Sequence, residues 1–194
     1  MKPFNIPIQA LLICGGDSSR MGKPKALLNY HGMSQYKWLQ VMCHQLQIPA
    51  FISCKQEQKD WFEQGTPLIF DLEKYAAAGP MSGLLSAMEQ LPALPLFLIG
   101  CDYPLLSIKD MMHLIQSFER VDKTCAFYQS KKGLFEPLLA IYHPKDFLNA
   151  KQHYQDRQHS LQNFLRGIGA EPILPLNELA YKSFDTPEDF LSFR

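Results

Sequence analysis

Glycines and cationic side chains gather at one point of the chain, directly after a largely apolar run. Residues 8–13 have strand character, and Gly15 and Gly16 follow them. Arg20 and Lys25 lie further along the same segment. Glycine lets main-chain N–H groups approach an anion closely, and Arg and Lys add charge-assisted hydrogen bonds to phosphate oxygens. The pattern predicts a phosphate-binding loop, although an ordinary glycine turn between a strand and a helix would use the same residue types.

The two common phosphate-loop motifs do not match this segment. A P-loop requires Gly-Lys followed by Ser or Thr, but Gly22 and Lys23 are followed by Pro24. The dinucleotide fingerprint Gly-x-Gly-x-x-Gly is absent as well, because Gly15 and Gly16 are adjacent. The loop therefore indicates an anion site without identifying the anion.

Aspartates follow two of the apolar runs. Residues 94–99 form a continuous apolar run, typical of a central strand covered on both faces, and Asp102 comes shortly after it. Asp71 directly follows the shorter run at residues 67–70. A carboxylate at such a point suits Mg²⁺, which is commonly held by one or two carboxylates together with substrate phosphates. Asp102 could equally cap a helix that starts near Ser107, and Asp71 could simply begin a turn.

A second glycine-containing segment precedes a helical pattern at residues 83–91. Its sequence is Gly79-Pro80-Met81-Ser82-Gly83. Glycines here would allow a ligand to approach, and a helix N-terminus offers free N–H groups. The same residues would also serve as an ordinary helix start with Ser82 as the N-cap.

Strand and helix patterns alternate along the chain. The expected strands are at residues 8–13, 50–53, 67–70, 94–99, 125–129, 137–142 and 172–176. The expected helices are at residues 34–47, around 61–62, and at 83–91, 107–119, 161–168 and 186–193. This alternation predicts an α/β fold with a mostly parallel central sheet and helices on both faces. Ligands of such sheets bind beyond the carboxyl ends of the strands, where Gly15, Asp71 and Asp102 would meet. No repeat or linker divides the chain, so we expect one domain over residues 1–194.

Composition restricts the partners. The 194 residues carry 19 Lys plus Arg and 19 Asp plus Glu, which argues against a dedicated nucleic-acid binder but permits a small anionic ligand. No apolar run reaches the length of a membrane span, and the N-terminal residues lack the apolar core of a secretion signal. The five cysteines form no CxxC pair, which favours reduced thiols and a cytoplasmic location. The six histidines show no metal-binding spacing.

Residues 15–28 resemble a known family. They read Gly-Gly-x-x-Ser-Arg-Met-Gly-x-x-Lys-Ala-Leu-Leu, which resembles the opening of the molybdenum cofactor guanylyltransferases, a group of MobA-like nucleotidyltransferases. Three later blocks match in order: Gly-Pro-x-x-Gly at residues 79–83, Cys-Asp-x-Pro at 101–104 and Thr-Pro-Glu at 186–188. The resemblance therefore covers nearly the whole chain, and it implies a three-layer Rossmann-like nucleotidyltransferase fold.

The resemblance also implies a reaction and a set of site residues. GMP would pass from GTP to the terminal phosphate of molybdopterin (Mo-molybdopterin), with release of pyrophosphate. Arg20 and Lys25 would hold the triphosphate, and Asp102 would bind Mg²⁺. The residues implied to contact the nucleotide are Leu12, Gly15, Gly16, Lys25, Ser53, Asp71, Gly79 and Asp102. The glycines of the loop, together with Gly79 and Pro80, favour guanine over cytosine. Molybdoenzymes that receive the cofactor, or their chaperones, are possible partners; no nucleic acid or membrane is expected.

Two departures from the family affect mainly the acceptor side. Ser53 stands where the family usually has Asn after the second strand. The segment that reads Asn-x-Asn-Thr-Pro-Glu in the family carries Ser183 and Asp185 in place of the two amides. The alternatives are cytidylyl transfer, another nucleotidyltransferase reaction of the same fold, and a non-catalytic nucleotide-binding chaperone for a molybdoenzyme. Retention of both Lys25 and Asp102 favours an enzyme, because binding alone does not require the metal carboxylate.

Overall fold

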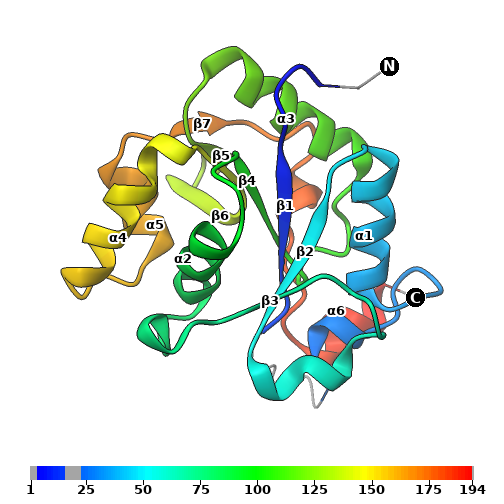
Figure 1. Cartoon of the computed structure of the whole chain (residues 1–194). Helices are drawn as coiled ribbons and strands as arrows, with labels where there is room; N and C mark the ends of the chain where they lie inside the picture. Colours follow the sequence, from blue (N-terminus) through cyan, green and yellow to red (C-terminus); the bar gives the residue numbers. More distant parts are fainter. Residues whose placement is uncertain (1–3, 16–22, 194) are drawn as a thin grey trace.

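The computed structural model of the chain describes residues 4–15 and 23–193 (Figure 1). Within these residues, seven strands form one sheet in the order β3-β2-β1-β4-β6-β5-β7. The strands are β1 (Gln9–Ile13), β2 (Ala50–Cys54), β3 (Leu68–Phe70), β4 (Leu96–Gly100), β5 (Cys125–Gln129), β6 (Leu134–Tyr142) and β7 (Glu171–Ile173). The sheet is the scaffold that carries the predicted site residues.

The sheet is mostly parallel, as the alternation of strands and helices predicted. Only β6 runs antiparallel to its neighbours β4 and β5 among the described strands. Its direction follows from the short connection after β5, which turns at Gly133 with φ of 66°. A short turn can join only antiparallel strands, whereas parallel strands need a longer crossover.

Helices cover both faces of the sheet, giving three layers (Figure 1). The helices are α1 (Gln35–Gln45), α2 (Pro80–Gln90), α3 (Ile108–Val121), α4 (Phe147–Gln155), α5 (Leu161–Gly167) and α6 (Pro187–Ser192). Apolar side chains of α1 and α3 pack on one face, and those of α2, α4 and α5 pack on the other. The alternation along β1 matches this arrangement, because Ala10 and Leu12 face the first layer while Leu11 faces the second. The three-layer Rossmann-like expectation is confirmed.

Several elements differ from the sequence-based expectation. Helix α4 was not predicted, since Leu148 is 78% exposed and Ala150 is its one fully buried residue, so the helix has little apolar periodicity. The helix expected near residues 61–62 is a 3₁₀ helix at Gln56–Trp61, and the expected long helix at 161–168 is the seven-residue α5. Strand β6 begins at Leu134, ahead of the proline that marked its expected start.

All five cysteines are free and buried. No helix of the described residues is both long and apolar enough to cross a bilayer.

Candidate active site

The strand ends bring Gly15, Asp71 and Asp102 to one edge of the sheet. Gly15 follows β1, Asp71 follows β3 and Asp102 follows β4, and these strands are parallel. Main-chain hydrogen bonds continue the sheet past the strand ends: the N–H of Asp71 donates to the carbonyl of Cys54 at 3.2 Å, and that of Cys101 donates to Ile13 at 3.4 Å. The structure thus places these residues where the strand order required them.

A cavity of about 350 Å³ opens at this edge, between the ends of β1, β2 and β3 and the start of α2. Its size lies in the range of small-molecule sites. The cavity is lined by Ile13, Gly15, Ser53, Lys55, Asp71, Ala77, Gly79, Pro80, Ser82 and Gly83. Four of the residues predicted to contact the nucleotide, namely Gly15, Ser53, Asp71 and Gly79, therefore share one cavity.

Glycines allow helix α2 to stand close to the end of β2. Gly79 is the N-cap of α2 and has φ of 58°, a conformation that a side chain disfavours. A Cβ added at Gly83 would collide with Ser53 Oγ. Ser82, considered above as a possible N-cap, instead stabilises the preceding turn: its hydroxyl accepts from Ala78 N at 3.1 Å and donates to the carbonyl of Tyr75. Because Gly79 and Gly83 carry no side chains, α2 can lie close to β2 while the cavity wall stays free of side chains at these two positions.

Asp71 presents a carboxylate to the cavity. Ser53 Oγ donates a long hydrogen bond of 3.5 Å to Asp71 Oδ1. Burial raises the pKa of Asp71, and the hydrogen bond from Ser53 opposes that shift. An ionised carboxylate only accepts hydrogen bonds, so this part of the cavity selects for ligand groups that donate.

Asp102 lies in the turn after β4 and has an unusual environment. Its Oδ1 is buried and accepts no hydrogen bond from the described residues. Burial raises the pKa of Asp102 to about 6, and the charge of Lys25 opposes that rise. The alternative role as a cap of the following helix does not apply, because Ser107 caps α3 through a reciprocal pair of hydrogen bonds with Asp110. A buried carboxylate oxygen without a donor is suited to a cation.

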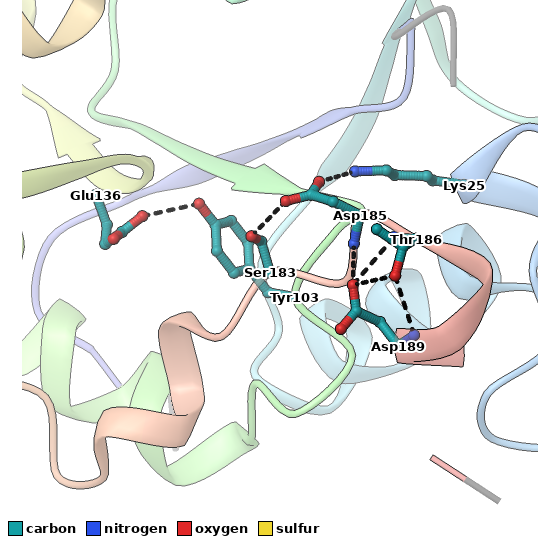
Figure 2. A network of polar contacts seen from close by, with 7 residues as sticks. All are labelled: Lys25, Tyr103, Glu136, Ser183, Asp185, Thr186 and Asp189. Carbon is teal, nitrogen blue, oxygen red and sulfur yellow. Dashed lines mark hydrogen bonds and ion pairs between the residues drawn. The ribbon is translucent and has the colours of Figure 1, made fainter. Parts of the chain in front are cut away.

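Lys25 forms an ion pair with Asp185 (Figure 2). The side chains of Lys25 and Asp185 are 22% and 48% exposed. Asp185 Oδ2 also accepts from Ser183 Oγ at 2.9 Å. The hydrogen bond from Lys25 is the main cause of the lowered pKa of Asp185. Asp185, expected on the acceptor side, thus faces the lysine expected to bind phosphate.

A helix cap fixes this part of the C-terminal segment. Asp189 Oδ2 accepts from the main-chain N–H groups of Asp185 and Thr186, both at 3.0 Å, and Thr186 caps α6. The N–H of Phe184 donates to the carbonyl of Asp102 at 2.8 Å. The Thr-Pro-Glu block therefore works locally as a helix start that holds residues 183–185 against the end of β4.

The remaining predicted residues lie elsewhere. Leu12 is fully buried in the core, and the next residue, Ile13, lines the cavity. Gly16 and Arg20 fall outside the residues that the structure describes. Sequence reasoning missed the hydrogen-bonded pair of Tyr103 and Glu136 beside Asp102, because nothing in the local pattern relates residues 33 positions apart.

The chain is similar to known proteins over most of its length. The model of the MobA-like NTP transferase domain family matches residues 10–172. A molybdenum cofactor biosynthesis bifunctional protein of Synechocystis sp. is 30% identical over 95% of this chain, which spans about half (53%) of that longer protein. A probable molybdenum cofactor guanylyltransferase of Bacillus anthracis is 31% identical over 80% of this chain and 78% of its own length.

A solved structure shares the fold. Molybdopterin-guanine dinucleotide biosynthesis protein A from Archaeoglobus fulgidus superposes with a TM-score of 0.76. The alignment covers 95% of this chain and 96% of the other, at 16% sequence identity. At this level of identity the likeness establishes the fold.

Proposed function

The chain belongs to the MobA-like NTP transferase domain family, and from that premise we propose that it is a molybdenum cofactor guanylyltransferase. It would transfer GMP from GTP to the terminal phosphate of molybdopterin and release pyrophosphate. The observation that carries this proposal is the convergence, at one sheet edge, of a nucleoside-sized cavity with Lys25 and the unpartnered carboxylate oxygen of Asp102.

The choice of base is supported by Asp71. Guanine carries two adjacent donors, N1–H and the 2-amino group, which an ionised carboxylate can accept as a pair. Adenine and cytosine place a ring acceptor beside their amino group, and that acceptor would face the carboxylate unfavourably. A half-buried carboxylate at the cavity wall therefore fits guanine best among the common bases.

The residues around Asp102 fit Mg²⁺. The described residues hold no group of three or more potential metal-ligating side chains, so a cation here would take its other ligands from phosphates and water. That is the usual situation of Mg²⁺ in phosphate-transferring enzymes. When bound, Mg²⁺ would supply charge neutralisation on the triphosphate. Asp102 would hold it through the buried Oδ1.

The chemistry requires no protein nucleophile. An oxygen of the acceptor's terminal phosphate attacks the α-phosphorus of GTP, and a new phosphorus–oxygen bond forms there. The bond from the α-phosphorus to the bridging oxygen breaks, and pyrophosphate leaves. The protein acts by positioning the two phosphates and by stabilising charge, which is the role proposed for Lys25 and for Arg20, a residue outside the described part of the chain. Molybdoenzymes or their chaperones would receive the product.

Calorimetry with GTP, CTP and ATP in the presence of Mg²⁺ tests the choice of nucleotide. We expect GTP to bind most tightly; equal or tighter binding of CTP would rule out the guanylyl assignment. A second measurement follows pyrophosphate release after Mo-molybdopterin is added. Tight GTP binding without pyrophosphate release would identify a non-catalytic nucleotide-binding module instead.

A further inference from the structure

The turn that carries Asp102 is fastened to the neighbouring strand β6 by a side-chain hydrogen bond. Tyr103 Oη donates to Glu136 Oε2 at 2.9 Å (Figure 2). Tyr103 is 5% exposed and Glu136 is 8% exposed, so water competes little for this bond. Figure 2 shows Tyr103 lying between Glu136 and the segment of Ser183 and Asp185.

The side chains of Asp102 and Tyr103 share the space above Gly100, the last residue of β4. A Cβ added at Gly100 would collide with Asp102 Oδ1, and it would come within 3.0 Å of Tyr103 Cε2 and 3.2 Å of Leu138 Cβ on β6. The carboxylate and the ring are therefore packed over the same main-chain atoms. A shift of the ring changes the space that is open to the carboxylate.

Burying the carboxylate of Glu136 at this position costs free energy. A buried carboxylate loses its hydration, and burial raises its pKa. Its oxygens are satisfied by two donors, the hydroxyl of Tyr103 and the side-chain amide of Gln129. Because a carboxylate only accepts, it also fixes the direction in which the Tyr103 hydroxyl points.

The main chain of the same turn is held from the other side. The carbonyl of Asp102 accepts from Phe184 N at 2.8 Å, and the carbonyl of Pro104 contacts His31 Nε2 at 2.9 Å. These bonds fix the path of the backbone but not the direction of the Asp102 side chain. The bond between Tyr103 and Glu136 instead fixes an aromatic ring that packs beside the carboxylate.

We infer that Tyr103 and Glu136 are positioning residues that hold the Asp102 carboxylate in the orientation required to bind a divalent cation. The inference rests on the proposed function of Asp102. The matched block Cys-Asp-x-Pro leaves the third position open, and in this chain Tyr103 fills it and reaches a partner on β6.

The test is the variant Tyr103→Phe, which keeps the ring and removes the hydroxyl. Binding of Mn²⁺ to the GTP-bound protein is measured by electron paramagnetic resonance, and binding of GTP without metal by calorimetry. We expect Mn²⁺ affinity to fall about tenfold, because the ring that packs beside Asp102 loses its anchor on Glu136. Metal-free GTP affinity should stay within about twofold, because the base cavity lies away from Tyr103.

Glu136 provides a second, independent variant. Glu136→Ala should weaken Mn²⁺ binding at least as much as Tyr103→Phe, and combining the two should add little to the effect of Glu136→Ala, because both remove the same bond. Glu136→Gln retains an acceptor oxygen and should recover part of the affinity. Fully additive losses in the double variant would overturn the inference.

Tyr142→Phe is the matched control. Tyr142 is buried on β6, the strand that also carries Glu136, and its hydroxyl donates to the carbonyl of Pro137 at 3.0 Å. This variant should lower the melting temperature without changing Mn²⁺ affinity. If Tyr103→Phe behaves like this control while Asp102→Asn abolishes Mn²⁺ binding, the inference is wrong and the metal role of Asp102 stands. If Asp102→Asn also binds Mn²⁺ normally, the metal role fails and the inference fails with it.

Discussion

At the edge of the sheet, the side formed by β1, β2, β3 and α2 presents mainly small residues, together with Asp71 and Lys55, around an open cavity. The side formed by β4, β6 and residues 183–189 instead presents charged and aromatic side chains that contact one another. We refer to these as the cavity side and the network side. The cavity side offers about 350 Å³ of space that is lined largely by small residues. On the network side, Asp185 already holds Lys25, so a phosphate that binds this lysine, as proposed, would have to compete with a carboxylate.

Asp102→Asn should have the largest effect, and it tests whether the network side holds the metal that turnover requires. An amide cannot replace the charge of the carboxylate, so Mg²⁺-dependent pyrophosphate release should fall by more than about a hundredfold. Metal-free GTP affinity should change far less. Asp110→Asn, eight residues along, is the control: it weakens the cap of α3 and should reduce stability rather than turnover. Near-normal turnover in Asp102→Asn would show that the metal is held elsewhere.

Lys25→Ala should be next in size. A charge-assisted hydrogen bond to phosphate contributes roughly 1.5–3 kcal/mol, so GTP affinity should fall by about one to two orders of magnitude. Calorimetry measures the change. Lys37→Ala removes another lysine that is ion-paired, with Glu63 on the surface, and should leave GTP affinity unchanged. Equal behaviour of the two variants would mean that Lys25 does not contact the nucleotide.

Asp71→Asn tests the cavity side. Replacing the acceptor-only carboxylate by an amide places a donor against the donors of guanine, so the ratio of GTP to ATP affinity should fall by about tenfold. Because both nucleotides carry the same triphosphate, this ratio isolates the base. Ser53→Ala, which removes the long hydrogen bond to Asp71, should change the ratio much less. An unchanged ratio in Asp71→Asn would remove Asp71 from base recognition.

If Asp71 recognises the base, the ratio of GTP to ATP affinity should also depend on pH. Burial raises the pKa of Asp71 above its ordinary value, so the acceptor-only form is present at neutral pH and is lost as the pH falls through the raised pKa. The ratio of GTP to ATP affinity should therefore decline as the pH is lowered from neutral through that raised pKa. In Asp71→Asn the ratio should be flat over that range. A wild-type ratio that does not respond to pH would contradict the assignment.

The cavity side was the more predictable of the two. Gly15, Asp71 and Gly79 each follow or precede a recognisable element, and parallel strands bring their carboxyl ends together. Local sequence therefore carried enough information to place these residues. Leu12 shows the limit, because a residue inside a strand next to the loop points into the core and not into the cavity.

The network side depends on contacts between distant parts of the chain. Lys25 and Asp185 are 160 positions apart, and no periodic pattern links them. Asp185 was expected near the acceptor because the family has an amide there, yet the cap formed by Thr186 and Asp189 directs it to Lys25. Pairings of this kind are set by how the C-terminal segment packs on β4, which single-sequence patterns do not encode.

Asp185→Asn should have the smallest effect, and it bears most directly on the comparison of the two sides. Asp185 is ion-paired with Lys25, so a phosphate that binds Lys25 as proposed would have to displace this carboxylate. Both side chains are partly exposed, and pairs of this kind contribute at most about 1 kcal/mol. Removing the charge should therefore tighten metal-free GTP binding by only about two- to fivefold. Ser183→Ala, which removes the other hydrogen bond to Asp185 without a change of charge, should have a weaker effect in the same assay. Loss of GTP affinity in Asp185→Asn would show that the carboxylate assists the nucleotide, for example by orienting Lys25, and would mean that the network side is as preformed as the cavity side.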